Sequence, residues 1–113
     1  MNLTTDRVGA AVVVRVGEPK MTYQALSGFA DTVSALLAGG DRRLVIDLSR
    51  VVYVDSATIG CLMDLYRQAD KLQGTIKLAG VQQRVETMLT MTGAHRFLAL
   101  HPDESSAIDS FGE

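Results

Sequence analysis

Two aspartate–serine segments of this chain have the residue types for chemistry. Asp55 is followed directly by Ser56, and Asp47 is followed one residue later by Ser49; each aspartate ends a short apolar run. Asp and Ser accept hydrogen bonds from the free backbone N–H groups at the start of a helix, so a helix N-cap is the simplest interpretation of Asp55-Ser56. A serine in this position also presents a hydroxyl that can be modified.

Catalytic and metal-binding sites are not predicted. A serine nucleophile needs a histidine base and an orienting acid, but nothing connects His95 or His101 with Ser56. The single Cys61 and the two histidines lack metal-ligand spacing, and Cys61 is expected to fill the core. The nucleotide-binding pattern G-x-x-x-x-G-K-[ST] does not occur. The sequence therefore predicts neither an enzyme nor a cofactor.

Asp47 and Asp55 could lie near each other and hold Mg²⁺, as in a phosphoacceptor receiver domain. Such a domain also needs an acidic pair after its first strand and a lysine after a late strand. Gly17-Glu18 and His101-Pro102 stand there instead, so this alternative is set aside.

Composition limits the other classes of function. The 113 residues are 47% hydrophobic and 21% charged with a net charge of −2, which is typical of one globular domain over residues 1–113. Lys and Arg form no basic stripe, so nucleic acid is not an expected partner. Apolar runs fall short of the roughly 18 residues that suggest a membrane span, and no membrane insertion is expected. One cysteine and no secretory signal predict a cytoplasmic protein.

The hydrophobic pattern predicts alternating strands and helices. A run of apolar residues at a spacing near 3.6 begins after Ser56, so a helix should start there. Thr22 is a candidate N-cap for an earlier helix, and a hairpin is expected across residues 6–9. Strands are expected at 1–5, 10–16, 44–48, 75–79 and 97–100, with a further apolar run at 51–54, and helices at 23–37, 57–72 and 82–92 and after Pro102. This order predicts an α/β fold with a mixed, largely parallel sheet of four to five strands and about four helices.

Two segments closely resemble the STAS domain, the family of the anti-sigma factor antagonists and of the cytoplasmic domains of sulphate transporters. In that family a strand ends in Asp-Leu-Ser, and Asp-Ser followed by small residues comes a few positions later. The matching segments are Val45-Ile46-Asp47-Leu48-Ser49-Arg50-Val51 and Val54-Asp55-Ser56-Ala57-Thr58-Ile59-Gly60-Cys61-Leu62. Further matches are Leu78-Ala79-Gly80-Val81 and Val85 through Leu89, leading to Thr92-Gly93 and Phe97-Leu98.

The resemblance implies a function. In the antagonist branch the serine after Asp, here Ser56, is phosphorylated by an anti-sigma factor that is also a serine kinase. The unphosphorylated antagonist binds the anti-sigma factor and frees the sigma factor, and a serine/threonine phosphatase reverses the modification. The implied switch surface consists of Asp47, Ser49, Asp55, Ala57, Thr58 and Gly60.

Two positions depart from the family pattern. Thr58 stands where Gly is common, and Ala57 where a second Ser or Thr is usual. Ala57 leaves Ser56 with one fewer competing hydroxyl, whereas Thr58 is a secondary phosphoacceptor candidate whose bulk could restrict partners. The alternative is a STAS scaffold or accessory subunit of a transport or signalling complex, in which Ser56 is only a cap.

Overall fold

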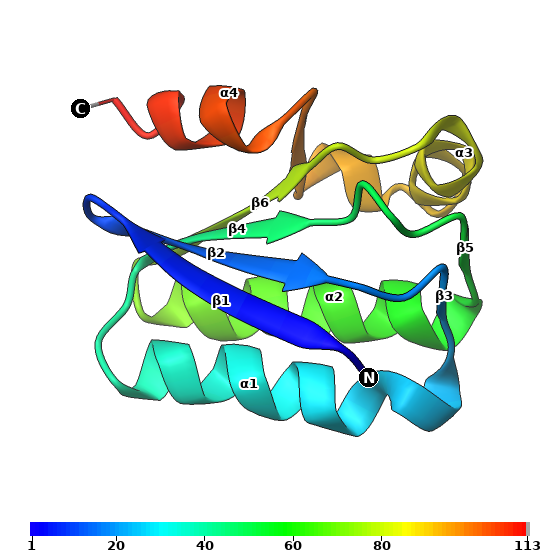
Figure 1. Cartoon of the computed structure of the whole chain (residues 1–113), viewed down its shortest axis with the longest axis horizontal. Coiled ribbons are helices and arrows are strands. Elements are labelled where there is room, and N and C mark those ends of the chain that lie inside the picture. Colours follow the sequence, from blue (N-terminus) through cyan, green and yellow to red (C-terminus); the bar gives the residue numbers. More distant parts are fainter. Residues whose placement is uncertain (113) are drawn as a thin grey trace.

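The computed structural model describes residues 1–112 and has the expected mixed α/β architecture. Three strands, β2, β4 and β6, form the middle of a five-stranded sheet, and helices cover both faces of it (Figure 1). The elements are β1 Leu3–Val8, β2 Ala11–Val16, β3 Lys20–Met21, a 3₁₀ turn Tyr23–Ala25, α1 Leu26–Ala38, β4 Arg43–Asp47, β5 Tyr53–Val54, α2 Ser56–Lys71, β6 Thr75–Ala79, α3 Gln83–Thr92, a 3₁₀ turn Ala94–Arg96, β7 Ala99–His101 and α4 Glu104–Asp109.

The sheet has the order β1-β2-β4-β6-β7, and only the β1–β2 pair is antiparallel. The predicted hairpin is present, but its loop is shorter than expected. Asp6 and Arg7 belong to β1 and pair with β2, and the turn consists of Gly9 and Ala10 alone. Gly9 has a φ of 59°, a backbone conformation that glycine adopts without strain, which permits so tight a turn.

A second, two-stranded sheet lies at one end of the molecule. β3 and β5 pair in parallel, with Met21 opposite Val54. The sequence predicted an apolar run at 51–54 but no strand at Lys20–Met21, because two residues carry no periodic signal. This small sheet matters for the site, since it fixes the residues that precede α1 beside those that precede α2.

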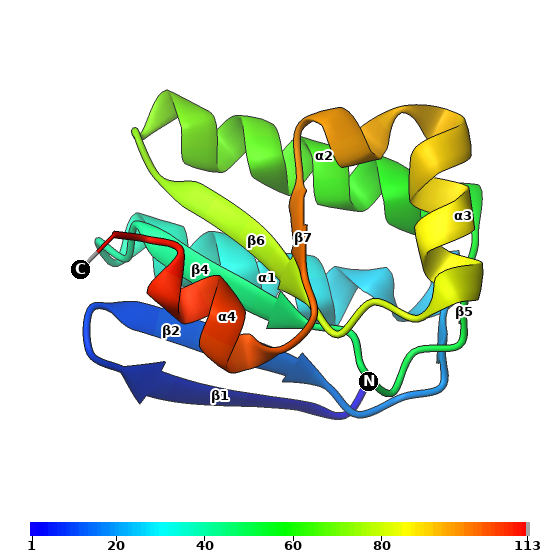
Figure 2. The same ribbon diagram turned by 90° about the horizontal axis from the view of Figure 1, so that it is seen from above.

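Strand alternation divides the interior into a large and a small core. Leu44, Ile46 and Leu48 point toward α1 and α2, where the fully buried Phe29 belongs to the same cluster. Val45 points the other way, toward α4, in a small cluster with Val13, Ala79 and Ala107. Figure 2 shows α4 lying over the sheet on the side opposite α1 and α2.

The C-terminal third differs from the prediction in detail. α3 matches the expected helix, and its last residue, Thr92, is exposed and donates its hydroxyl hydrogen to the Met88 carbonyl. The last strand begins at Ala99, because the chain first makes a 3₁₀ turn after α3. Phe97, predicted to start that strand, is 53% exposed and pairs with the ring of Tyr66.

Candidate functional site

The junction between β5 and α2 is organised by the carboxylate of Asp55. One oxygen, Oδ1, accepts the backbone N–H of Thr58 at 2.9 Å, which is the N-cap that the sequence predicted. The other oxygen, Oδ2, accepts the backbone N–H of Tyr23 at 2.9 Å. A single side chain therefore caps the start of α2 and also holds the loop that leads into α1.

That second hydrogen bond corrects the predicted role of Thr22. The Thr22 side chain makes no capping hydrogen bond, and the helix expected to start near Tyr23 begins as a 3₁₀ turn before α1. Asp55, which is 32 residues away in the chain, supplies the missing acceptor. Local sequence could not reveal it, because the two segments meet only through the β3–β5 pairing.

These hydrogen bonds keep Asp55 ionised. Burial raises the pKa of this carboxyl, but the hydrogen bonds from the Thr58 hydroxyl and from the N–H groups of Tyr23 and Thr58 outweigh it, and the pKa lies below its ordinary value. Asp55 makes no ion pair within the described residues. Its negative charge is held by neutral donors and is not balanced by a cation.

Thr58 is buried, which corrects its predicted place on the switch surface. Among residues 1–112, Thr58 is the only polar side chain that is fully buried, with 0% exposure. Its Oγ1 lies 2.7 Å from Asp55 Oδ1 and 2.7 Å from the Met21 carbonyl oxygen. A hydroxyl has one proton and donates it to one of these acceptors at a time. The bulk of Thr58 thus points into the molecule and does not restrict partners from outside.

Ser56 is exposed at the first position of α2. Its hydroxyl has no hydrogen-bond partner within residues 1–112, because Asp55 already occupies the capping role. Asp55 and Ser56, which the sequence indicated together as an N-cap, therefore have different roles. Asp55 is the cap, and Ser56 presents a free hydroxyl at a helix N-terminus, where backbone N–H groups and the helix dipole favour an anion.

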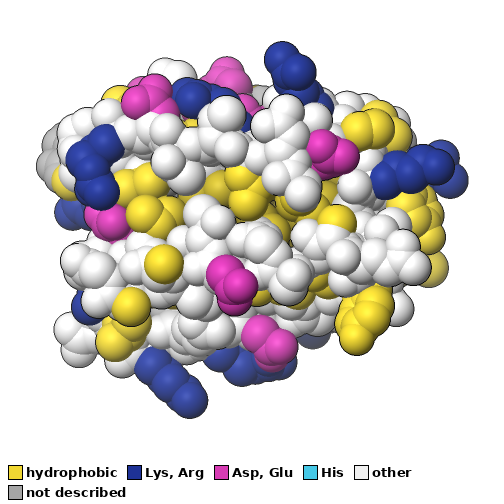
Figure 3. Space-filling view, turned by 60° about the horizontal axis from the view of Figure 1, so that its bottom comes forward, with side chains coloured by type: hydrophobic (Ala, Val, Ile, Leu, Met, Phe, Trp, Pro, Cys, Tyr) yellow, Lys and Arg dark blue, Asp and Glu magenta, His cyan; other side chains and the backbone are white. Residues whose placement is uncertain are grey.

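A shallow groove between α1 and α2 adjoins Ser56. It has a volume of about 590 Å³, and its α2 wall is formed by Ala57, Gly60, Cys61 and Asp64. Tyr23, which is 75% exposed, stands on the α1 wall. Figure 3 shows the side of the molecule that carries α1 and α2, where hydrophobic side chains lie in recesses and most Lys and Arg side chains lie at the margin.

The predicted surface residues Ala57 and Gly60 are thus both in this groove. Gly60 is exposed within a helix, and a Cβ added there would meet nothing within 4 Å. Cys61, predicted as core filler, is only half-buried. Burial and then the charge of Asp64 raise the pKa of the Cys61 thiol, so this group is not an activated thiolate.

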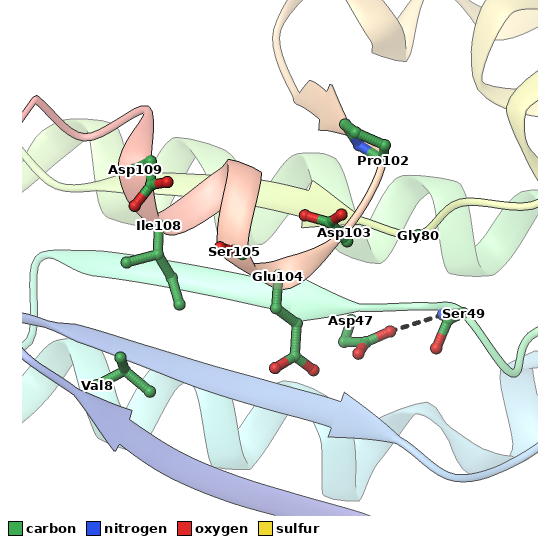
Figure 4. A pocket seen from close by; sticks show the side chains of 10 residues that line it. All are labelled: Val8, Asp47, Ser49, Gly80, Pro102, Asp103, Glu104, Ser105, Ile108 and Asp109. Carbon is green, nitrogen blue, oxygen red and sulfur yellow. Dashed lines mark hydrogen bonds between the residues drawn. The ribbon is translucent and has the colours of Figure 1, made fainter.

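Asp47 and Ser49 lie apart from this junction. Asp47 has the same parity in β4 as Val45, so it projects toward α4, whereas α2 covers the opposite face of the sheet (Figure 4). Asp47 Oδ1 accepts the Ser49 backbone N–H at 2.8 Å and closes the turn after the strand. Gly80 lets this turn approach closely, since a Cβ there would lie 2.8 Å from the Ser49 Cβ. The structure does not bring Asp47 next to Asp55.

The surroundings of Asp47 are charged. Arg15 forms two hydrogen bonds with Glu104, at 2.7 and 2.9 Å, which fasten the start of α4 to β2. Burial raises the pKa of Asp47, whereas hydrogen bonding from Ser49 and the charge of Arg15 lower it, and the pKa lies below its ordinary value. An open groove of about 610 Å³ runs beside these groups under α4, and Figure 4 shows its lining.

No group of three or more His, Cys, Asp or Glu side chains within residues 1–112 could hold a metal ion. His95 is exposed, and His101 Nε2 lies 3.3 Å from Ser110 Oγ on the α4 side of the sheet, so neither histidine is placed as a base for Ser56. In the same part of the chain, no helix is both long enough and apolar enough to cross a membrane.

Sequence reasoning missed Tyr23 and Met21 as parts of the site. Met21 is fully buried and contributes only its carbonyl oxygen, which no side-chain pattern reports. Tyr23 contributes a backbone N–H and an exposed ring. The available signal was an aromatic residue at the polar start of a predicted helix, since exposed aromatic side chains are enriched at protein interfaces.

The chain is similar in sequence or in fold to several known proteins. BtrV of Bordetella bronchiseptica, which carries the name of an anti-sigma factor antagonist, is 26% identical over 106 residues, or 94% of this chain and 88% of BtrV. The crystal structure of an anti-sigma factor antagonist from Mycobacterium paratuberculosis has a TM-score of 0.88 at 20% identity, covering 99% of this chain and 94% of that one. Phosphorylated SpoIIAA of Bacillus has a TM-score of 0.76 at 17% identity, covering 97% and 99%.

The family assignment comes from the sequence itself. Residues 3–101, from β1 through β7, match the family described as "Mlab, STAS domain". The chain belongs to the STAS domain family.

Proposed function

We propose that this protein is an anti-sigma factor antagonist that is switched by phosphorylation of Ser56. In its unphosphorylated form it binds an anti-sigma factor that is also a serine kinase, and this frees the sigma factor. Phosphorylation of Ser56 dissociates the complex, and a serine/threonine phosphatase restores the binding form. The protein itself catalyses no step and acts in the cytoplasm.

The single observation that carries this proposal is the free hydroxyl of Ser56. It is exposed, has no hydrogen-bond partner within the described residues, and begins a helix of 16 residues. A kinase can reach such a hydroxyl without unfolding the chain. Esterification of the Ser56 hydroxyl removes no hydrogen bond of the α2 cap, because that hydroxyl caps nothing.

A phosphate on Ser56 would act at an interface. It adds a charge of about −1.5 to −2 at neutral pH and three acceptor oxygens. The helix N-terminus tolerates that charge within the folded domain. The groove formed by Tyr23, Ala57 and Gly60 is next to it, so a partner seated there would have to desolvate the phosphate beside the uncompensated carboxylate of Asp55.

Thr58 is not a suitable acceptor in this structure. Its hydroxyl is fully buried and lies within hydrogen-bond distance of two oxygen atoms. Phosphorylation there would require α2 to unwind its first turn. We therefore retain Ser56 as the only acceptor in the proposal, with Asp55, Ala57 and Gly60 as its immediate surroundings.

The test is a phosphosite map of the protein isolated from its native host, grown under several stress conditions. We expect a single phosphate on Ser56 that disappears in Ser56→Ala. Ser49→Ala is the matched control, because Ser49 is also exposed and also follows an aspartate turn, yet lies toward the other face of the sheet. Protein that stays unmodified under every condition, with Ser56→Ala fully functional, would contradict the proposal.

A second candidate function is favoured by one observation. The matching family is described by the name Mlab and not as an anti-sigma factor antagonist. In this alternative the chain is a STAS scaffold or accessory subunit that binds its partner permanently through the same groove, and Ser56 is never modified. Retention of the partner by Ser56→Glu would favour this alternative, whereas loss of the partner would favour the switch.

A further inference from the structure

Asp55 is hydrogen-bonded on both of its oxygen atoms to two different parts of the chain. Oδ1 takes the N–H of Thr58 in α2, and Oδ2 takes the N–H of Tyr23 in the loop before α1. Rotation of this one carboxylate therefore affects both segments. Ser56, the next residue, is the proposed phosphoacceptor.

Thr58 strengthens this connection from inside. Its buried hydroxyl lies 2.7 Å from Asp55 Oδ1 and 2.7 Å from the carbonyl oxygen of Met21, the last residue of β3, and donates to one of them at a time. The backbone N–H of Asp55 also lies 3.4 Å from that carbonyl. The loop at 21–23 is thus joined to the first turn of α2 by side-chain and backbone hydrogen bonds, all of which involve Asp55 or Thr58.

We propose that Asp55 and Thr58 are positioning residues that transmit the charge on Ser56 to the loop bearing Tyr23. A phosphate on Ser56 repels the adjacent carboxylate and competes with it for the first-turn N–H groups. Asp55 then releases the Tyr23 N–H, and the 3₁₀ turn at Tyr23–Ala25 loses its acceptor. The exposed Tyr23 ring moves, and the groove beside Ser56 changes shape on its α1 wall.

This inference rests on the proposed function, since it assumes that Ser56 carries the phosphate, and it adds how a partner senses that phosphate. A partner seated in the groove contacts Tyr23 in the 3₁₀ turn before α1 as well as Ala57 on α2. The partner therefore loses contact at Tyr23 as well as at the modified side chain of Ser56. The signal spreads through two hydrogen-bonded residues and needs no change in the sheet.

The test uses the whole chain with phosphoserine installed at position 56 by amber suppression, and amide hydrogen exchange followed by NMR. We expect the Tyr23 amide to exchange about tenfold faster than in the unmodified chain, because its acceptor is lost. Amides of β2 and β4 should be unchanged. Ser49→Glu, which adds charge at an exposed serine on another turn, should leave Tyr23 unaffected.

Asp55→Asn provides the decisive variant. Its Oδ1 can still cap Thr58, but its amide nitrogen cannot accept the Tyr23 N–H, so the amide of Tyr23 should exchange fast with or without phosphoserine. Thr58→Val should weaken the response and Thr58→Ser should restore it. A Tyr23 amide that does not respond to phosphoserine, or that responds equally in Asp55→Asn, would overturn the relay. Because the phosphate is installed directly, that result would leave the phosphosite map, and hence the proposed switch, unaffected.

Discussion

Asp47 and Asp55 make similar local hydrogen bonds but have different surroundings. Each stands at the end of a strand, Asp47 as the last residue of β4 and Asp55 directly after β5, and accepts a backbone N–H from a residue two or three positions later, Ser49 or Thr58. Apart from that hydrogen bond, Asp47 lies near the charged groups of Arg15 and Glu104. Asp55 meets only neutral donors, the N–H of Tyr23 and the hydroxyl of Thr58.

The difference shows how a carboxylate can be fixed beside an ion pair or among neutral donors alone. At Asp47 the nearby cation Arg15 is paired with Glu104, and this pair fastens α4 to the sheet. At Asp55 the neutral donors fix the geometry but leave a full negative charge beside Ser56. A phosphate added there increases an existing charge, whereas the Asp47 region is built for attachment of a helix.

Removing the Asp55 carboxylate should have the largest effect on stability. Asp55→Ala takes away a helix cap and also leaves the Tyr23 N–H and the Thr58 hydroxyl with fewer partners, so we expect a loss of about 2–3 kcal/mol in the free energy of unfolding. Urea denaturation measures it. Asp103→Ala is the matched control, because Asp103 caps α4 through one N–H, that of Ser106, and should cost less. Equal losses would mean that the Tyr23 link adds nothing.

Acid titration should separate the two aspartates by their salt dependence. The pKa of Asp55 is lower in the folded protein than in the unfolded chain, so its contribution to stability is complete above the ordinary value of 3.8 and is lost as the pH falls through the lower folded value. Asp55→Asn should therefore make stability fall less steeply below about pH 4. Asp47→Asn should do the same at low ionic strength.

At about 1 M salt the charge of Arg15 is screened over a few ångströms, so the Asp47→Asn difference should lose the part that comes from Arg15 and keep the part that comes from the Ser49 hydrogen bonds, while the Asp55→Asn difference persists in full. Urea denaturation between pH 2.5 and 7 at two salt concentrations checks this. Parallel responses of the two variants to salt would contradict the distinction between neutral and ionic partners.

Breaking the ion pair beneath α4 should have a smaller effect. Arg15 and Glu104 are 38% and 24% exposed, so solvent screens them, and Arg15→Gln should cost about 0.5–1 kcal/mol in the free energy of unfolding. The loss should be smaller at high salt. Arg67→Gln, at a more exposed pair with Asp64, is the control and should have almost no effect. A loss above about 2 kcal/mol in Arg15→Gln would show that α4 is more than a surface attachment.

Sequence reasoning succeeded where structure is local. The 3.6-residue spacing after Ser56 predicted α2, and the alternation of Leu44, Ile46 and Leu48 in the structure agrees with a buried strand. The cap at Asp55 followed from residue type alone. The alternation of side chains along β4 also predicts the orientation of Asp47. Leu44, Ile46 and Leu48 face α1 and α2, so Asp47 must face the other side of the sheet.

The remainder depended on contacts between distant segments. The acceptor for the Tyr23 N–H is 32 residues away and is brought there by β3 and β5, two strands of two residues each. The burial of Thr58 follows from the same contact, because the Met21 carbonyl reaches its hydroxyl only across that small sheet. Neither feature has a periodic or compositional signature within its own segment.

The smallest effect on stability, and the most informative about function, is expected at Ser56. If Asp55 alone is the cap, Ser56→Ala should change the free energy of unfolding by less than about 0.5 kcal/mol. Urea denaturation of Ser56→Ala beside Asp55→Ala measures this. A loss near 1 kcal/mol would mean that the Ser56 hydroxyl shares the cap in solution, and its proposed freedom for phosphorylation would be contradicted. If Ser56→Ala leaves the free energy of unfolding unchanged, Asp55 and Ser56 have separate roles: Asp55 is needed for the fold, and Ser56 is available for the switch.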